Sequence, residues 1–215
     1  TQAGRTIVDI TTFVQTRLPA LSMAVVEDGT AKQLKGCRGT WSLAGNIGEA
    51  MLFSFQFNGI LQGDPADAGT VTGVTYTAQV PPSMLGVTFQ VGDVGDTTEL
   101  LEFSPRFQAV TLDHGNSIGI PRDAGETTGV YGSAHITSRA SQGSVTVDVG
   151  PENNYNFLAK LIDAEASHMR LEIGTTDGNR FHVSSPGVIF NSEGLGDQEG
   201  IGTRDLGFRV ASRRP

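Results

Sequence analysis

The stretch that decides the fold covers residues 51–59 and reads Met-Leu-Phe-Ser-Phe-Gln-Phe-Asn-Gly. Its odd-numbered positions up to Phe57 are Met or Phe, whereas the even-numbered positions after Leu52 are Ser, Gln and Asn. Strict alternation of apolar and polar residues is typical of a β-strand that buries one face and exposes the other. This stretch therefore predicts a half-buried strand with an aromatic face.

Further strand signals lie on both sides of this stretch. Residues 21–27 and 31–36 flank Asp28-Gly29, a dipeptide that type I′ hairpin turns favour because both central residues need a positive φ. The chain contains 28 glycines and 9 prolines, which indicates many turns between short strands. Other segments with strand patterns are residues 7–9, 35–43, 71–80, 86–91, 107–114, 134–139, 143–149, 169–173, 181–183 and 206–210.

One segment predicts a helix. Pro151 and Glu152 suit its first turn, because a proline loses no hydrogen bond there and a carboxylate is stabilised by the helix dipole. So short a helix needs a partner surface. We therefore expect a mainly β fold, an antiparallel β-sandwich or open barrel with one short packed α-helix. The apolar stripe expected to pack on the sheet consists of Phe157, Leu158, Leu161 and Ile162, extended by Tyr155.

The length and composition suit one substantial domain. A chain of 215 residues with 38% hydrophobic residues is long enough to bury roughly 70% of its unfolded surface. We expect residues 1–215 to form a single β domain, in which residues 1–30 are either an integral part or the end of a preceding segment. No apolar run approaches the length of a membrane span, so no membrane association is expected. The single cysteine, Cys37, excludes an internal disulfide framework and is interpreted as a small buried strand residue.

The charge of the chain argues against a protein that grips nucleic acid. The formal net charge is -8, and no Lys or Arg occurs between Arg38 and Arg106. Nucleic-acid binding depends on neutralising phosphates with Lys and Arg, so a chain of this charge is a poor candidate for it. The same charge is compatible with a protein past which nucleic acid must move freely.

No catalytic constellation stands out. Residues 115–119 match the Gly-x-Ser-x-Gly pattern around Ser117, but that motif works only at a sharp strand-to-helix turn. Pro121 and a glycine-rich segment follow here instead of a helix. Candidate partners show no characteristic spacing, so we expect no enzymatic activity and no cofactor. These candidate partners are Asp148, Asp163, His168 and His182.

The sequence also predicts no metal site. The four histidines, His114, His135, His168 and His182, are not spaced as metal ligands on a helix would be. Two acidic pairs, Asp64 with Asp67 and Asp93 with Asp96, carry oxygen ligands but do not follow the EF-hand pattern.

Several short motifs occur in an order that resembles the tail tube proteins, or major tail proteins, of long-tailed bacteriophages. Each motif alone is weak, but their order and spacing extend over most of the chain after about residue 31. The positions that carry the resemblance are Gly36, Arg38, Gly39 and Thr40, then Gly48-Glu49, then 53–59, Asp113, Gly115 and Asn116, Arg139, Gly143, Ser144 and Thr146, the helix near Glu152, 177–183 and 200–210.

The resemblance implies a structural virion protein. Subunits would form hexameric rings that stack into the tail tube, through which the genome leaves the capsid without specific binding to the wall. Other expected partners are the tape measure, tail terminator and tail-tip proteins. The expected location is the virion tail, assembled in the host cytoplasm.

Two long loops are the expected contacts between stacked rings. Residues 58–69 are acidic and glycine-rich, and residues 115–129 contain too much glycine and proline for regular structure. The C-terminus is basic and offers a complementary charge. The candidate contact residues are Asp64, Asp67, Asn116, Arg122, Asp123, Arg213 and Arg214.

Three alternatives remain open from the sequence. A non-polymerising β-sandwich binding module would show exposed aromatic residues on one face and remain monomeric. A tail-tip or tail-completion protein would share the same sequence signals but stop at a single ring. A serine hydrolase would lose its activity in Ser117→Ala.

Overall fold

The computed structural model describes residues 6–9, 20–27, 30–63, 66–67, 82–94, 106–126, 130, 132–148, 155–174 and 179–211. The described chain is mainly β, with antiparallel pairing throughout except for one parallel pair, and it contains one short α-helix. The fold class predicted from the sequence is therefore confirmed. The strands are β1 (Thr6–Asp9), β2 (Leu21–Glu27), β3 (Thr30–Asn46), β4 (Leu52–Leu61), β5 (Ala66–Asp67), β6 (Thr88–Asp93), β7 (Phe107–Asp113), β8 (Asn116–Gly119), β9 (His135–Arg139), β10 (Gln142–Asp148), β11 (Ala166–Ile173), β12 (Phe181–Gln198) and β13 (Ile201–Val210), and the helix is α1 (Phe157–Ile162).

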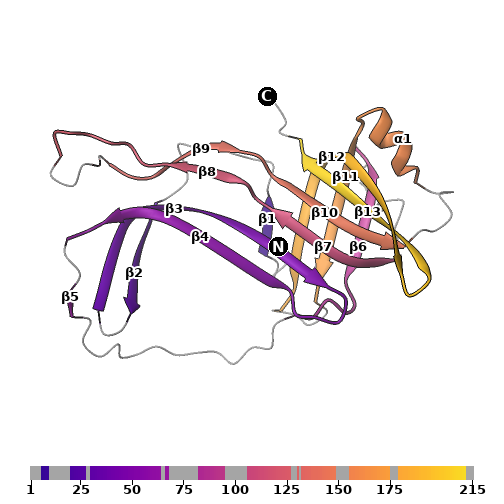
Figure 1. The fold of residues 1–215 in the computed structure, drawn as a ribbon, viewed down its shortest axis with the longest axis horizontal. Helices are drawn as coiled ribbons and strands as arrows, with labels where there is room; N and C mark the ends of the chain where they lie inside the picture. Colours follow the sequence, from indigo (N-terminus) through magenta and orange to yellow (C-terminus); the bar gives the residue numbers. More distant parts are fainter. Residues whose placement is uncertain are drawn as a thin grey trace.

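The strands form a body and two extensions (Figure 1). The larger sheet has the order β2-β3-β7-β10-β13-β12-β11-β6, while β4 and β5 pair with β3 and β1 pairs with β12. The body consists of β6, β7, β10–β13 and α1. We call β2, β4 and the first part of β3, up to Trp41, the arm, and we call the β8–β9 pair the hairpin. Both reach away from the body in the same direction.

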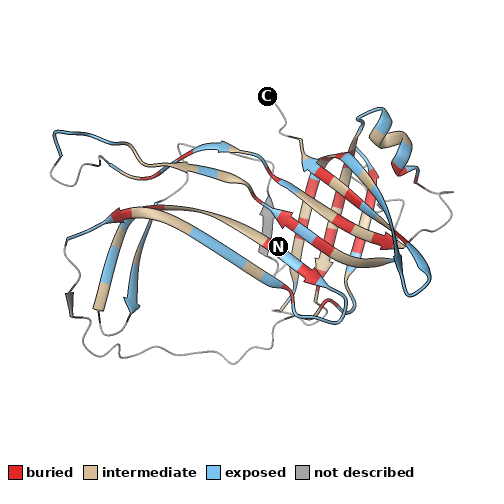
Figure 2. Cartoon of the chain, viewed as in Figure 1, coloured by how far each residue is buried: buried red, intermediate tan, exposed pale blue. Residues whose placement is uncertain are grey.

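The body sheet folds back on itself around the main core. Phe89 of β6 stacks on Phe107 of β7 with ring centroids 5.4 Å apart, although four strands separate these two in the sheet order. Buried residues alternate along the strands between, as Met169, Leu171 and Ile173 do in β11. Figure 2 shows this buried set concentrated in the body, whereas the arm is mostly half-buried or exposed. Such packing of two layers on one core is the arrangement of a β-sandwich.

The helix is shorter than predicted and begins later. The expected start at Pro151 and Glu152 is wrong, because residues 155–156 are not helical and α1 begins at Phe157; residues 151–154 lie outside the described residues. Asn156 is the N-cap, and its Oδ1 accepts a hydrogen bond from the N–H of Ala159 at 3.0 Å. Asn is among the favoured N-cap residues because its side chain satisfies a free N–H of the first turn.

Only part of the predicted apolar stripe faces the core, namely Tyr155, Phe157 and Leu161. Phe157 is buried and meets Phe190 of β12 edge-on, with ring centroids 5.2 Å apart, and Leu161 packs against the same core. Leu158 and Ile162, by contrast, are exposed. The reason is geometric, because at 3.6 residues per turn the four residues span an arc of about 140°, and the sheet covers the edge with Phe157 and Leu161 but not the edge with Leu158 and Ile162.

The two predicted loops are partly regular. Residues 58–61 continue β4, and residues 66–67 form β5 opposite the start of β3. Residues 116–119 form β8 and pair with β9. Pairing satisfies the backbone groups of these glycine-rich segments, which the sequence pattern alone did not indicate. The strand predicted at residues 71–80 lies outside the described residues.

Gly143 leaves a space in the sheet that an aromatic ring fills. It pairs with Leu112 of β7 on one side and with Phe208 of β13 on the other. A Cβ atom at residue 143 would lie 2.3 Å from the carbonyl oxygen of Thr111 and 2.7 Å from Cζ of Phe208. The absence of a side chain therefore lets the Phe208 ring lie against the strand backbone.

We predict that Gly143→Ala destabilises the fold by about 1–3 kcal/mol, because the added methyl overpacks the sheet. The control is Gly194→Ala, where the nearest atom to an added Cβ is Cβ of Asp205 at 3.7 Å. That distance is ordinary contact, so the control should change stability by no more than about 0.5 kcal/mol. Chemical denaturation of both variants measures the difference, and equal stabilities would contradict the packing described for Phe208.

Candidate functional surface

The outer side of the body sheet carries a ladder of small polar residues. Side chains alternate across a strand, so the neighbours of the core row lie on the opposite face. One core row contains Leu43, Leu112, Gly143 and Phe208. The outer row beside it runs across five strands in register and consists of Ala44, Thr111, Ser144, Gly207 and Ser192.

Two further rows widen this surface. One contains Ser42, Asp113, Gln142 and Arg209, and the other contains Asn46, Ala109, Thr146, Asp205 and Gly194. We call the three rows together the polar face. Its charged residues are Asp113, Asp205 and Arg209, so it has no lysine and a net charge of -1. Most of its side chains are too short to project far from the sheet.

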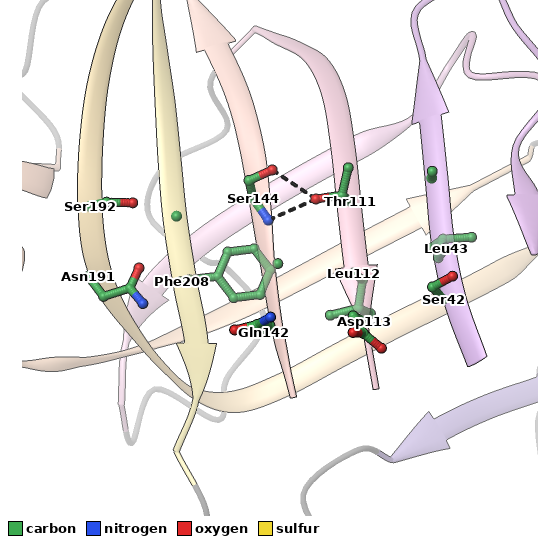
Figure 3. A pocket seen from close by; sticks show the side chains of 13 residues that line it. Ser42, Leu43, Thr111, Leu112, Asp113, Gln142, Ser144, Asn191, Ser192 and Phe208 are labelled. Atoms are coloured by element: carbon green, nitrogen blue, oxygen red, sulfur yellow. Dashed lines mark hydrogen bonds between the residues drawn. The ribbon is translucent and has the colours of Figure 1, made fainter. Parts of the chain in front are cut away.

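The polar face is hollowed where its rows meet (Figure 3). The hollow has a volume of about 490 Å³. Its polar lining comes from Ser and Thr residues, Asp113, Gln142 and Asn191, and its apolar lining from Leu43, Ala44, Leu112 and Phe208. Thr111 Oγ1 lies 2.8 Å from Ser144 Oγ and accepts a hydrogen bond from the Ser144 N–H at 3.2 Å. Thr146 donates to the carboxylate of Asp205. The hydroxyls of Thr111, Ser144 and Thr146 thus have partners within the sheet, so they line a polar surface rather than a reactive site.

The predicted contact residue Asn116 has its polar groups engaged inside the chain. Its Nδ2 donates to the carbonyl oxygen of Gly39 at 2.9 Å, and its N–H donates to Thr40 Oγ1 at 3.2 Å. Its Oδ1 accepts from Nε of Arg139 at 3.1 Å. Asn116 therefore ties the base of the hairpin to β3.

Two other predicted contact residues lie together at the far end of the hairpin. Arg122 and Asp123 are both exposed, and Asp123 Oδ1 accepts a hydrogen bond from the N–H of Gly125 at 2.8 Å. Their use in ring contacts stays a prediction. Asp67 lies in β5 opposite Thr30, but its side chain, together with Asp64, Arg213 and Arg214, lies outside the described residues.

The candidate catalytic and metal-binding residues are not brought together. Ser117 lies in β8 opposite Ser138, not at a strand-to-helix turn. His168 Nε2 lies 3.1 Å from Ser184 Oγ between neighbouring strands, and His135 is exposed in β9. Within the part of the chain that the structure describes, no group of three or more His, Cys, Asp or Glu side chains is placed to hold a metal ion.

Comparisons with known proteins leave the family open. Neither the protein-family models nor the curated proteins contain a match to this chain. Among the described residues, no helix is long and apolar enough to cross a lipid bilayer. The resemblance found in the sequence and the surfaces described above are therefore the basis for assigning a function.

A buried histidine marks the junction between the body, the arm and the hairpin. The imidazole of His114 stacks on Trp41 with ring centroids 5.2 Å apart. The backbone N–H of His114 donates a hydrogen bond to the Trp41 carbonyl oxygen at 3.0 Å. Its own carbonyl oxygen accepts from Ser141 Oγ at 2.8 Å. Burial lowers the pKa of His114 to about 4, helped by the positive charge of Arg139 and opposed by Asp113. The junction thus holds a neutral imidazole.

We predict that this imidazole makes the protein acid-sensitive. Its pKa is lower in the folded state than the usual value of 6.5, so its contribution to stability is complete above pH 6.5 and is lost as the pH falls toward 4. At about 1.4 kcal/mol per pKa unit the full difference would correspond to about 3 kcal/mol, and solvent screening of this partly buried ring reduces the expected loss to about 2 kcal/mol. In His114→Phe, the free energy of unfolding should fall less between pH 7 and pH 4 than in the wild type, because phenylalanine does not titrate but still stacks on Trp41. Chemical denaturation across this pH range measures the difference.

The control for this pH series is His135→Phe, which makes the same replacement at an exposed position. It should retain the acid sensitivity of the wild type. If His114→Phe and the wild type lose stability in parallel, the junction does not depend on a neutral histidine.

Proposed function

We propose that this chain is the structural subunit of the tail tube of a long-tailed bacteriophage. In this proposal it forms hexameric rings that stack into a conduit for DNA ejection, in the virion tail, after assembly in the host cytoplasm. It acts with tape measure, tail terminator and tail-tip proteins, and it needs neither a cofactor nor an enzymatic activity. The proposal starts from the resemblance of the ordered sequence motifs.

The polar face is the observation that carries this proposal furthest. A conduit for DNA needs a wall that is hydrated but does not hold phosphates, and such a wall must avoid clusters of Lys and Arg. The polar face extends over five strands, has a net charge of -1 and presents short hydroxyl and amide side chains. Its acidic groups, Asp113 and Asp205, repel phosphates. We therefore assign the lumen wall to this face.

Unpaired strand edges also support assembly. Among the described strands, β4 pairs only with β3, and β6 pairs only with β11. An exposed edge is a site where another chain adds a strand, and closing a ring removes such edges. A ring that joins subunits edge to edge would pair the open edges of both β4 and β6.

One observation favours the alternative of a binding module that does not polymerise. Phe55 is 62% exposed and lies between Phe53 and Phe57, whose ring centroids are 6.0 and 6.3 Å from its own and whose planes are nearly parallel to it. Phe53 and Phe57 are half-buried, so Phe55 is the exposed ring of this row, and an exposed aromatic ring is the feature expected of a module that stacks on a ligand such as a carbohydrate. Such a module would stay monomeric at all concentrations.

Electron microscopy of the purified chain, concentrated at moderate salt, separates these functions. The tail-tube proposal predicts tubes of uniform width or stacked rings with a central hole. Single rings that never stack would instead favour a tail-tip or tail-completion protein. Monomers at every concentration would favour the binding module and overturn the tube proposal.

The lumen assignment predicts a gain of DNA retention in Ser144→Lys. Ser144 lies in the middle of the polar face, so each ring would carry lysines toward the lumen, where they bind phosphates in a salt-dependent manner. Tubes of this variant, assembled with linear DNA and treated with nuclease, should retain protected DNA that wild-type tubes release.

The matched control is Leu195→Lys, which adds the same charge at an exposed position of β12 on the side of the sheet opposite to the polar face. Tubes of the control should leave any bound DNA open to digestion. Equal protection in both variants, or none in Ser144→Lys, would contradict the assignment of the polar face to the lumen.

A further inference from the structure

The arm carries an apolar face that remains exposed within the described part of the chain. Trp41 pairs with Phe55, and Leu34 pairs with Leu61 and Met23, so these side chains lie on one side of the β2–β3–β4 sheet. The same side supplies Leu43 to the main core. Away from the core, large apolar side chains on this side remain exposed. We call them the arm face: Leu21, Val25, Phe55 and Leu61.

The helix α1 is apolar on two sides. Its inner side holds Phe157 and Leu161 against the body sheet. Its outer side presents Leu158 and Ile162, which are spaced by four residues and therefore adjacent, and Ile162 is 70% exposed. The apolar arc of α1 is therefore wider than the part of it that the body sheet covers, and a second apolar surface could cover the rest.

The two open surfaces lie at opposite ends of an elongated molecule. Figure 1 shows the arm extending away from the body and α1 at the far side of the body. One chain therefore cannot bring its own arm face onto its own helix. A contact between two copies can, and it would join two different surfaces.

The charges also distinguish the two ends. The arm together with its turn, residues 20–41 and 52–61, contains Lys32, Lys35 and Arg38 against Glu27 and Asp28, a net charge of +1 in a chain of net charge -8. Lys32 lies on the side of the arm face, where it pairs with Glu27 at 3.0 Å, whereas Lys35 and Arg38 lie on the other side of the same sheet. Around α1, the cation Lys160 is opposed by three carboxylates, because it bridges Asp93 at 2.7 Å and Glu165 at 2.9 Å while Asp163 is also exposed. An arm-to-helix contact joins unlike charges, whereas an arm-to-arm contact would join like charges.

We propose that the arm face of one copy docks on the outer side of α1 of a second copy. Helix on sheet is a standard way to bury an apolar sheet face, and here it would place α1 between its own sheet and that of its neighbour. The contact is heterologous, so it leaves a free arm and a free helix after each step and leads to closed rings or open filaments. The inference rests on the proposed function in that it names the surfaces through which subunits join.

The test uses one variant for each surface, followed by sedimentation analysis. Phe55→Asp removes the centre of the arm face, and Ile162→Asp removes the outer side of the helix. Each variant alone should need at least a tenfold higher concentration than the wild type to assemble. When the two variants are mixed, the intact arm of Ile162→Asp should dock on the intact helix of Phe55→Asp. The product should be a 1:1 complex that grows no further, because its remaining arm and helix are both altered.

Two matched controls make the same kind of change elsewhere. Leu52→Asp alters a side chain of the same strand that is 67% exposed but points to the opposite face, and Leu195→Asp alters one of β12 that is 79% exposed. Both should assemble as the wild type does. Circular dichroism of all four variants establishes that they are folded.

Different outcomes separate this docking from the tube proposal. If the wild type forms tubes and both surface variants do so at the same concentration, the docking is wrong and the tube stands. If the Ile162→Asp variant dimerises alone, or the mixture remains monomeric, the arm has another partner surface and the docking is wrong. If the wild type forms only rings or filaments without a lumen and both variants abolish them, the docking stands and the tube is wrong. A wild type that never associates overturns both.

Discussion

One continuous strand determines both parts of this molecule. β3 runs for 17 residues and pairs with β7 in the body and with β4 along the arm. Because side chains alternate along a strand, the side that places Leu43 in the core also places Trp41 and the β4 phenylalanines on the arm. The second layer of the sandwich ends before this apolar pattern does. Exposed aromatic surface on the arm is therefore a direct consequence of extending a core strand beyond its core.

The fold could be predicted from the sequence where apolar residues alternate. Residues 51–59 and 143–149 show this pattern, and the structure places β4 and β10 there. β12 was expected only at residues 181–183 but extends to Gln198. Its second half shows no apolar alternation that would predict a strand, and its pairing with β13 holds it in the sheet. The predicted start of the helix was wrong because a general preference was taken as a specific signal. Pro151 and Glu152 suit a first turn in general, but the side chain that satisfies the free N–H groups here is Asn156.

The candidate surfaces could not be predicted in the same way. The polar face joins Ala44, Thr111, Ser144 and Gly207, which are far apart in sequence, and only the register of three strand pairs aligns them. Each residue alone is an ordinary serine, threonine, alanine or glycine. The sequence did indicate that Ser and Thr alternate with apolar residues and that cations are scarce. These properties are those expected of a lumen wall, but they do not indicate which strands would form it. The open side of α1 was hidden as well, since its apolar residues were all assigned to the core.

A single irregularity in β3 keeps Leu34 on the same side of the arm as Trp41. Leu34 and Trp41 are an even and an odd position, and in a regular strand they would point to opposite sides. The register of β3 against β4 shifts between Lys35 and Arg38, where Gly36 has a φ of 63°. A bulge of one extra residue reverses the alternation, and glycine accepts that backbone conformation without strain. The bulge therefore returns Leu34 to the side of Trp41 and Phe55. Because the sequence maintains this apolar side beyond the reach of its own core, a role for it in contact with another chain is the simplest physical explanation.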